Sequence, residues 1–163
     1  MLLGPVLEPL RSSSIHKNLF TLPIRIQKHS QNAAFIAEQF LAKGAVVTYP
    51  GLTSHKQHEL FNSQMNPGYG YGGLFSIDMG TKEKANLFMV GMQKRHLGYL
   101  AVSLGYYKTL FSNSGTSTSS EIPLDVQRSM GLSEGLVRIS IGLDSDISST
   151  WKEMEAAYDE ASQ

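Results

Sequence analysis

Apolar residues in the first third of the chain recur with the period of a helix. The pattern extends from Arg11 to Lys43, and Pro23 must kink or interrupt it because proline offers no N–H to the preceding turn. Gly44 follows the last apolar residue and is expected to end the helix. After the break, five apolar residues form one stripe at helical spacing: Ala33, Ile36, Ala37, Phe40 and Leu41. This stripe predicts a helix packed on a sheet.

Four later stretches have the composition or the two-residue alternation expected of strands. They cover residues 45–49, 73–79, 98–103 and 136–143. The helices expected between and after them begin near Thr81 and Thr150, and the second of these has the spacing of a capping box. Two further apolar stripes are predicted to face the core: Ala85, Phe88, Met89 and Met92, and then Trp151, Met154 and Tyr158. The sequence therefore predicts a domain that contains both α-helices and β-strands, and it leaves the order of the strands in the sheet open.

The last of these strands has a polar side as well as an apolar one. Val137, Ile139 and Ile141 would face a core, so Arg138 and Ser140 would face the opposite way. A guanidinium fixed on a rigid strand is pre-positioned to hold a carboxylate through two parallel N–H bonds.

An internal salt bridge is the simpler interpretation of Arg138, with Asp78 or Asp144 as its partner. Two further polar features are equally ambiguous. Ser103 ends a predicted strand before a glycine turn, which is a common position for a binding side chain and also a common way to end a strand. Residues 112–120 are rich in Ser, Thr and Gly and are expected to form a polar loop.

Composition narrows the class of protein. The 163 residues are 41% apolar and 17% charged, which is typical of a single soluble domain with a core of its own. Fourteen basic residues balance fourteen acidic ones, so no net field favours nucleic acid or an anionic membrane. No cysteine is present, and the first residues lack the pattern of a signal peptide, so we expect a cytoplasmic protein without disulfides.

Two short motifs are weaker than they first seem. His55, His58 and Glu59 can share a helical face, yet their spacing is not that of a zinc protease and no third ligand stands at a recognisable interval, so no metal site is predicted. Gly68, Gly70 and Gly73 match the dinucleotide fingerprint, but a strand pattern follows them instead of a helix. We therefore expect a glycine loop whose backbone turns tightly or lies close to another element.

Taken together and in order, six short motifs resemble the C-terminal domain of the Cys/Met-metabolism family of pyridoxal-phosphate enzymes. They are Thr48-Tyr-Pro-Gly-Leu52, His55-x-x-His58-Glu-Leu60, Gly70-Tyr-Gly-Gly73, Ala101-Val-Ser-Leu-Gly105, Thr118-Ser-Ser120 and Gly135-Leu-Val-Arg-Ile-Ser140. Within the family, the chain is most similar to plant-type methionine γ-lyases. The resemblance covers nearly the whole chain, and an ordered set of motifs is far more specific than any one of them.

The resemblance implies a fold and a set of site residues. The fold would be the small α+β domain of the aminotransferase type, a mainly antiparallel four-stranded sheet with helices on one face. Arg138 matches the family arginine that holds the substrate α-carboxylate, and Ser103 matches a serine beside the cofactor imine. Val102 stands where cystathionine-handling relatives often have glutamate, which points toward a methionine-like thioether. Thr118 lies in the region of a family Thr-His-Ser motif, although Ser119 replaces the histidine.

The same resemblance implies that the chain, residues 1–163, is only the substrate-side domain of such an enzyme. None of its nine lysines stands in the Ser-x-x-Lys context of the family's Schiff-base lysine, so the larger domain that carries the lysine and most cofactor ligands is expected to be missing. The family, which is homotetrameric, would use pyridoxal 5′-phosphate as electron sink for γ-elimination of L-methionine to methanethiol, 2-oxobutyrate and ammonia.

Three interpretations remain open. The chain is expected to be a fragment of a methionine γ-lyase-like enzyme and inactive alone. Alternatively, it is a non-catalytic remnant that pairs with a full-length relative, or its specificity is that of a cystathionine γ-lyase or γ-synthase. A globular domain that shares only the family's fold is disfavoured by the number of motifs that agree in order.

Overall fold

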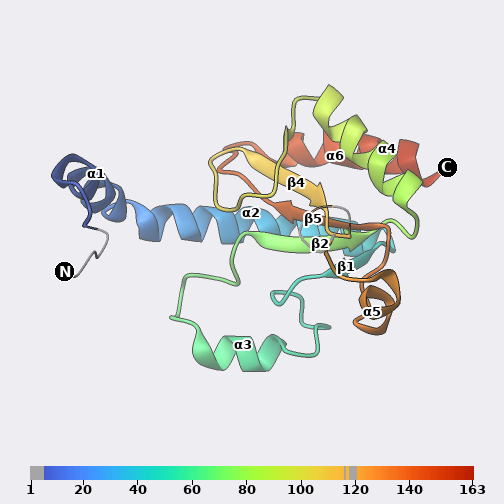
Figure 1. Cartoon of the computed structure of the whole chain (residues 1–163), viewed down its shortest axis with the longest axis horizontal. Helices are drawn as coiled ribbons and strands as arrows, with labels where there is room; N and C mark the ends of the chain where they lie inside the picture. Colours follow the sequence, from blue (N-terminus) through green and yellow to red (C-terminus); the bar gives the residue numbers. More distant parts are fainter. Residues whose placement is uncertain (1–5, 116, 118–120) are drawn as a thin grey trace.

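The fold is given by a computed structural model that describes residues 6–115, 117 and 121–163. Within these residues most strands are separated by helices, while α1 and α2, and β3 and β4, follow each other directly, as Figure 1 shows. In order they are α1 (Pro9–Leu19), α2 (Leu22–Ala42), β1 (Val46–Thr48), α3 (His58–Gln64), β2 (Leu74–Asp78), α4 (Lys82–Lys94), β3 (Gly98–Leu100), β4 (Thr109–Asn113), α5 (Leu124–Ser129), β5 (Leu136–Ser140) and α6 (Ile147–Ser162).

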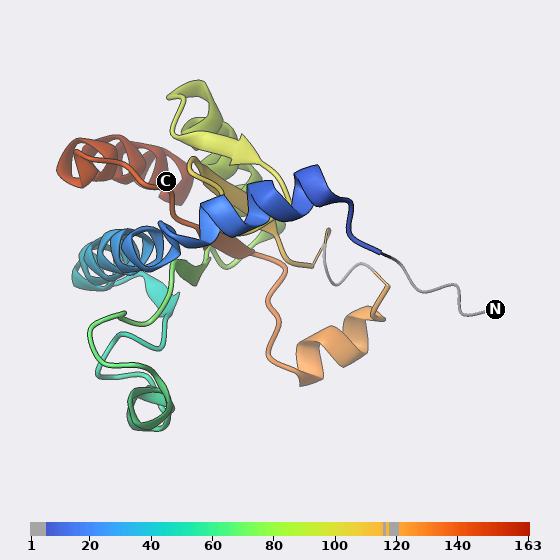
Figure 2. The same cartoon turned by 90° about the vertical axis from the view of Figure 1, so that its left-hand side faces the viewer.

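One sheet of five strands organises the molecule, in the order β1-β2-β5-β4-β3. Three neighbouring pairs are antiparallel, and β3 pairs with β4 in parallel. The long helices α2, α4 and α6 pack on one face of the sheet, and Figure 2 shows α2 and α6 on one side of it with α5 on the other. The predicted fold class, mainly antiparallel with helices on one face, is thus confirmed for the three long helices.

The predicted number of strands is wrong, because β4 lies in polar sequence. Its last two residues, Ser112 and Asn113, belong to the stretch for which the composition predicts a loop. All five residues of β4 are buried, since the strand lies between β3 and β5. The predicted strand 98–103 is also too long: β3 ends at Leu100, although the Ala101 N–H still donates to the Phe111 carbonyl at 3.1 Å.

The hydrophobic core lies between the sheet and the three long helices. Phe40 of α2 stands at its centre, and its ring contacts those of Trp151, Phe88, Tyr158 and Phe75 at centroid distances of 4.8, 6.0, 5.4 and 6.4 Å. The predicted stripes of α4 and α6 face this core, as does that of α2 apart from its last residue. That residue, Leu41, is 42% exposed.

Helix ends follow local chemistry. The chain breaks at Thr21, and Pro23 lies in the first turn of α2, where its missing N–H costs nothing. Gly44 adopts φ +81°, the left-handed conformation that ends a helix. The cap predicted for the last helix is wrong in position: α6 begins at Ile147, and the Asp146 carboxylate accepts from the Ser149 N–H.

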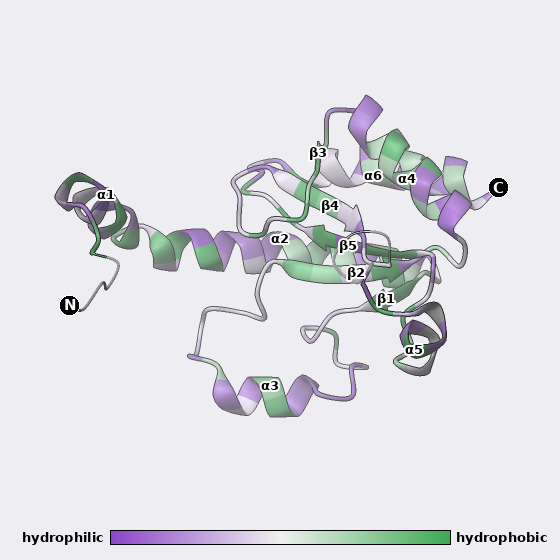
Figure 3. Cartoon of the chain, viewed as in Figure 1, coloured by the Kyte–Doolittle hydropathy of each residue, from purple (hydrophilic) through white to green (hydrophobic). Residues whose placement is uncertain are grey.

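The N-terminal helices form an arm that projects from the body of the protein (Figure 1). No residue of α1 is buried, and several large apolar side chains of the arm lie in solvent, among them Leu10 at 78%, Phe20 at 71% and Ile24 at 67% exposure. Figure 3 shows apolar residues along α1 and the first turns of α2. Among the described residues, no helix combines the length and the apolar character needed to cross a membrane.

Candidate functional site

A row of polar side chains crosses the face of the sheet that the long helices leave open. The strand register pairs Thr48 with Ser76, Ser76 with Arg138, and Arg138 with Ser112. Paired residues of neighbouring strands point to the same face and lie about 5 Å apart. Three hydroxyl-bearing residues and one guanidinium therefore share one line across β1, β2, β5 and β4.

The side chain of Arg138 is held by a backbone carbonyl. Its Nη2 donates to the Val102 carbonyl at 2.7 Å. Neither Asp78 nor Asp144, the two carboxylates considered from the sequence, pairs with it. The Asp78 carboxylate instead accepts from the Gly80 N–H and from the Ser133 hydroxyl, at 2.8 and 2.7 Å. Within the described part of the chain, no carboxylate forms an ion pair with Arg138, so the salt-bridge interpretation is wrong there.

The Val102 carbonyl reaches Arg138 because the segment after β3 crosses over β4. Ala101 still contacts β4, Val102 contacts Arg138 on β5, and the Gly105 N–H donates to the Ser140 hydroxyl on β5 at 3.1 Å. We call residues 101–105 the crossing segment. It covers Ser112 on β4 below it, which explains why a serine on the open face is only 3% exposed.

The fold thus brings some of the predicted site residues together. Val102 and Arg138 are in contact, and Ser103 follows Val102 on the crossing segment with its side chain in solvent. The expectation that Ser103 ends a strand is wrong, since β3 ends at Leu100. Thr118 and Ser119 lie outside the described residues.

A pocket of about 250 Å³ opens beside Arg138. It is lined by Thr48, Ser76 and Arg138 of the polar row, with Leu74, Leu136 and Ser114 around them. It offers hydroxyl donors next to a guanidinium whose other N–H groups make no protein hydrogen bond among the described residues. An anion with two acceptor oxygens suits this arrangement, because a carboxylate accepts two parallel bonds from one guanidinium.

Sequence reasoning missed Thr48, Ser76 and Ser112. The alternation within each strand indicates which residues share a face with Arg138 only after the strands are paired. For Ser112 even the strand was not recognised. The usable signal was the alternation of Leu74, Ser76 and Asp78 with the apolar residues between them.

The two weak motifs have structural roles. The glycine loop lies directly on α2, where a Cβ on Gly70 would stand 2.6 Å from the Ser30 Cβ and one on Gly73 would stand 2.9 Å from the His29 Cβ. This confirms the predicted close approach. His58 Nδ1 lies 2.8 Å from the Pro50 carbonyl, and its ring stacks on Tyr71 at 4.9 Å. In residues 6–115, 117 and 121–163, no three His, Asp or Glu side chains are placed to hold a metal ion.

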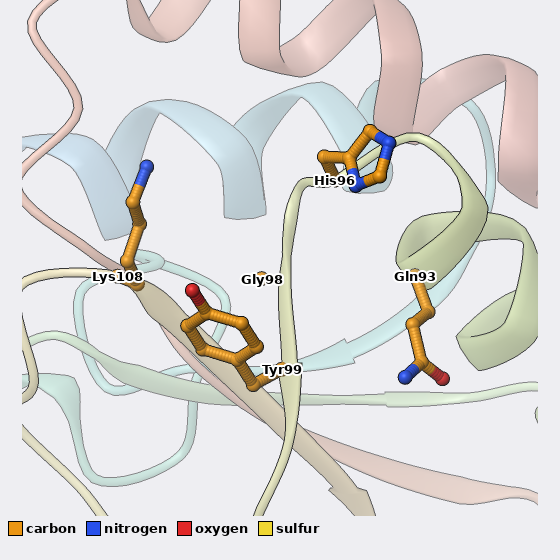
Figure 4. Close-up of a pocket in the computed structure, with 5 residues that line it drawn as sticks. All are labelled: Gln93, His96, Gly98, Tyr99 and Lys108. Carbon is orange, nitrogen blue, oxygen red and sulfur yellow. The ribbon is translucent and has the colours of Figure 1, made fainter.

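Another pocket, of about 370 Å³, lies where the parallel strands β3 and β4 begin. Figure 4 shows Tyr99 and Lys108 on one side of it, and on the other Gln93, near the end of α4, and His96, which follows that helix. Neither Arg138 nor the crossing segment lines it.

A pyridoxal cofactor is attached to an enzyme through a lysine, and the pockets on and beside the open face contain none among the described residues. No lysine lines the pocket beside Arg138, the pocket beside Ser112 or the pocket beside Ser140. Elsewhere, Lys43 pairs with Glu155 and Asp159, each at 2.9 Å, and the Lys84 ammonium donates to the Ser162 carbonyl at 2.7 Å. None of the three pockets on or beside the open face therefore offers a lysine for a covalent link to a cofactor.

Comparison with known proteins finds relatives that are much longer than this chain. The chain is 44% identical to the methionine gamma-lyase of Arabidopsis thaliana over 159 residues, which cover 97% of this chain and 36% of that protein. Among solved structures, the cystathionine gamma-lyase from yeast superposes with a TM-score of 0.82 at 30% identity, covering 91% of this chain and 37% of that one. A cystathionine gamma synthase from Xanthomonas oryzae pv. oryzae, solved with cystathionine, gives 0.77 at 28% identity, covering 89% and 36%.

The chain thus spans about a third of the length of these relatives. A family model for Cys/Met metabolism PLP-dependent enzymes matches residues 1–158, which is nearly the entire chain. The order of the sequence motifs, the shared fold and this match agree: the chain belongs to the Cys/Met metabolism PLP-dependent enzyme family.

Proposed function

We propose that this chain is the substrate-side part, residues 1–163, of a PLP-dependent carbon–sulfur lyase that acts on a methionine-like amino acid, and that it is inactive alone. Arg138 holds the α-carboxylate of the substrate on the open face. A polypeptide region that this chain lacks supplies the cofactor and its lysine. The proposal rests on the family membership and on the position of Arg138.

The observation that carries the proposal is the state of Arg138. It stands on the central strand β5, with one nitrogen held by the Val102 carbonyl and with no carboxylate paired to it among the described residues. A structural arginine on a sheet face is normally satisfied by an internal acid, because an unpaired charge costs desolvation. Here no internal acid occupies the guanidinium, so a ligand carboxylate can supply the counter-charge, and a pocket of about 250 Å³ lies beside it.

Val102 and Ser103 complete the proposed substrate contacts. Val102 is 59% exposed on the crossing segment, so its apolar side chain lies beside a carboxylate bound to Arg138 and favours an uncharged substrate side chain. This supports a thioether substrate over one with a second amino-acid head. Ser103 is exposed next to it. In this proposal it contacts the cofactor side of the substrate once the missing region covers the open face.

A second candidate function is association with a full-length relative as a non-catalytic partner. The arm of α1 and early α2 favours it, because Leu10, Phe20 and Ile24 are each more than 60% exposed and would leave solvent in an assembly. The same arm would also cover the missing region of an active enzyme. The two functions differ in whether turnover appears when that region is restored.

The test is a chimera in which the N-terminal region of the Arabidopsis thaliana relative precedes this chain. Wild-type chimera, Arg138→Ala and Arg138→Lys are compared for kcat/KM with L-methionine and for discrimination against its carboxamide. Loss of a charge-assisted, partly dehydrated bidentate contact costs about 2–5 kcal/mol, so Arg138→Ala should lower kcat/KM about 30- to 4,000-fold. Lysine should restore only part of this, because an ammonium lacks the planar fork.

Arg95→Ala is the matched control. Arg95 pairs with Glu153 and Glu160 between α4 and α6, away from the open face, so its loss should lower the melting temperature and leave kcat/KM unchanged. Equal effects of the two alanine substitutions, or equal discrimination against the carboxamide by Arg138→Ala and wild type, would remove Arg138 from substrate binding. A chimera that binds the cofactor without turnover would favour the non-catalytic partner.

A further inference from the structure

The pocket where β3 and β4 begin takes no part in the proposed function. Its volume of about 370 Å³ falls within the range of small-molecule sites, roughly 300–1,000 Å³. It shares no described lining residue with the pocket beside Arg138. Figure 4 shows Lys108 and Tyr99 on one side of it, and His96 and Gln93 on the other. A small ligand in this pocket would therefore have polar side chains on two sides.

The polar side chains of this pocket are hydrogen-bond donors without protein partners. The lysine ammonium, the tyrosine hydroxyl, the glutamine amide and the histidine ring can each donate. In the part of the chain that the structure describes, none of these four side chains forms a hydrogen bond or an ion pair. No aspartate or glutamate stands among the described lining residues. The half-buried Lys108 therefore brings a positive charge that no acid of the pocket wall balances.

His96 has a backbone conformation that glycine normally adopts. Its φ is +56°, and it is the one non-glycine residue with a positive φ among those described. The chain leaves α4 here: the His96 N–H donates to the Gln93 carbonyl at 3.0 Å, and the Leu97 N–H donates to the Met92 carbonyl at 3.1 Å. These two bonds form a Schellman motif, whose left-handed residue is usually glycine. A side chain in this conformation is strained, and strained residues cluster at binding sites.

From these observations we propose that the pocket binds a phosphate group, either free or carried by a small molecule. Lys108 supplies the charge, and the tyrosine, glutamine and histidine side chains donate to the phosphate oxygens. A phosphate suits the pocket better than a carboxylate, because its oxygens point in several directions and can accept from both sides. The last carbonyls of α4, which carry the negative end of the helix dipole, are occupied by the two Schellman bonds. The proposal does not rest on the proposed function.

The first test is an NMR titration of the 163-residue chain with sodium phosphate, with sodium chloride at equal ionic strength as the reference. The amide signals of Gly98 and Tyr99 should shift to saturation in phosphate and stay in place in chloride, with a Kd on the order of 1–10 mM. The titration is repeated with glycerol 3-phosphate. Tighter binding of this ester would indicate a phosphorylated small molecule as the ligand, and equal binding would indicate free phosphate. Absent shifts, or equal shifts in chloride, would overturn the proposal.

A matched pair of lysine substitutions tests the charge. Lys108→Gln should weaken phosphate binding about tenfold or more, because it removes a charge-assisted hydrogen bond. Lys94→Gln is the control: it changes the net charge equally, and Lys94 is exposed in the last turn of α4 without being among the described lining residues. This control should bind phosphate as wild type does. Equal weakening of both variants would reveal an effect of net charge alone, and wild-type binding by Lys108→Gln would exclude the site; either result refutes the proposal.

His96→Gly separates a ring that binds a ligand from a ring that supports the fold. Glycine adopts the left-handed conformation without strain, so the melting temperature should stay level or rise by a few degrees. Phosphate affinity should fall about two- to tenfold, because one donor is lost. A lower melting temperature with unchanged affinity would overturn the proposal, which requires donors on both sides of the pocket. Lys108→Gln leaves the backbone unchanged, so it decides the question if His96→Gly does not fold.

Discussion

Tyr49 allows a quantitative test of how the glycine loop is held against α2. Its side chain is fully buried, and its hydroxyl donates to the Gly72 carbonyl at 2.9 Å and lies 3.4 Å from the Ser30 carbonyl. Tyr49→Phe removes the donor and keeps the ring contacts with Tyr71 and Phe75. The lost hydrogen bond should lower the free energy of unfolding at pH 7 by about 1–1.5 kcal/mol.

The size of this difference should depend on pH. Burial raises the pKa of the Tyr49 hydroxyl far above its usual value, because the phenolate would lose its hydration. Above about pH 10, the unfolded chain releases this proton and the folded chain keeps it, so wild-type stability falls by up to about 1.4 kcal/mol per pH unit. The phenylalanine side chain of the variant has no proton to release, and all other titrating groups are common to both proteins. The deficit of Tyr49→Phe should therefore close near pH 11.

Urea unfolding between pH 7 and pH 11 measures both effects. Trp151 is the single tryptophan and is buried against Phe40, so its fluorescence reports global unfolding. Tyr99→Phe is the control at pH 7, where it should change stability by less than about 0.5 kcal/mol because Tyr99 is 52% exposed. A difference between Tyr49→Phe and wild type that stays constant from pH 8 to pH 11 would refute the reasoning.

Two further substitutions probe the core and the parallel strand pair. Phe40→Ala should lower the free energy of unfolding by about 3–5 kcal/mol, since it empties the centre of the aromatic cluster; a loss below about 1 kcal/mol in urea unfolding would contradict that position. Gly98→Ala should separate β3 from β4, because its Cβ would stand 2.0 Å from the Thr109 carbonyl oxygen; amide exchange in residues 109–113 should speed up, and unchanged protection would count against the pairing.

The sequence by itself determined the elements whose pattern is local. The stripe around Phe40 repeats at helical spacing and is buried, apart from Leu41, because one face of α2 packs on the sheet. The alternation around Arg138 placed it on the polar side of β5 because successive side chains of a strand point to opposite faces. The ordered motifs identified the family, since each depends only on neighbouring residues.

Only the tertiary structure decided what surrounds Arg138. β4 is rich in polar residues, and its burial comes from neighbours far along the chain, so no local pattern marks it as a strand. Pairing β5 with β2 and β4 brings Ser76 and Ser112 beside Arg138, and the crossing segment adds the Val102 carbonyl from 36 positions away in the sequence. All of these contacts depend on which distant strands pair and in which register. No single stretch of sequence encodes that register, because it is a property of two strands together.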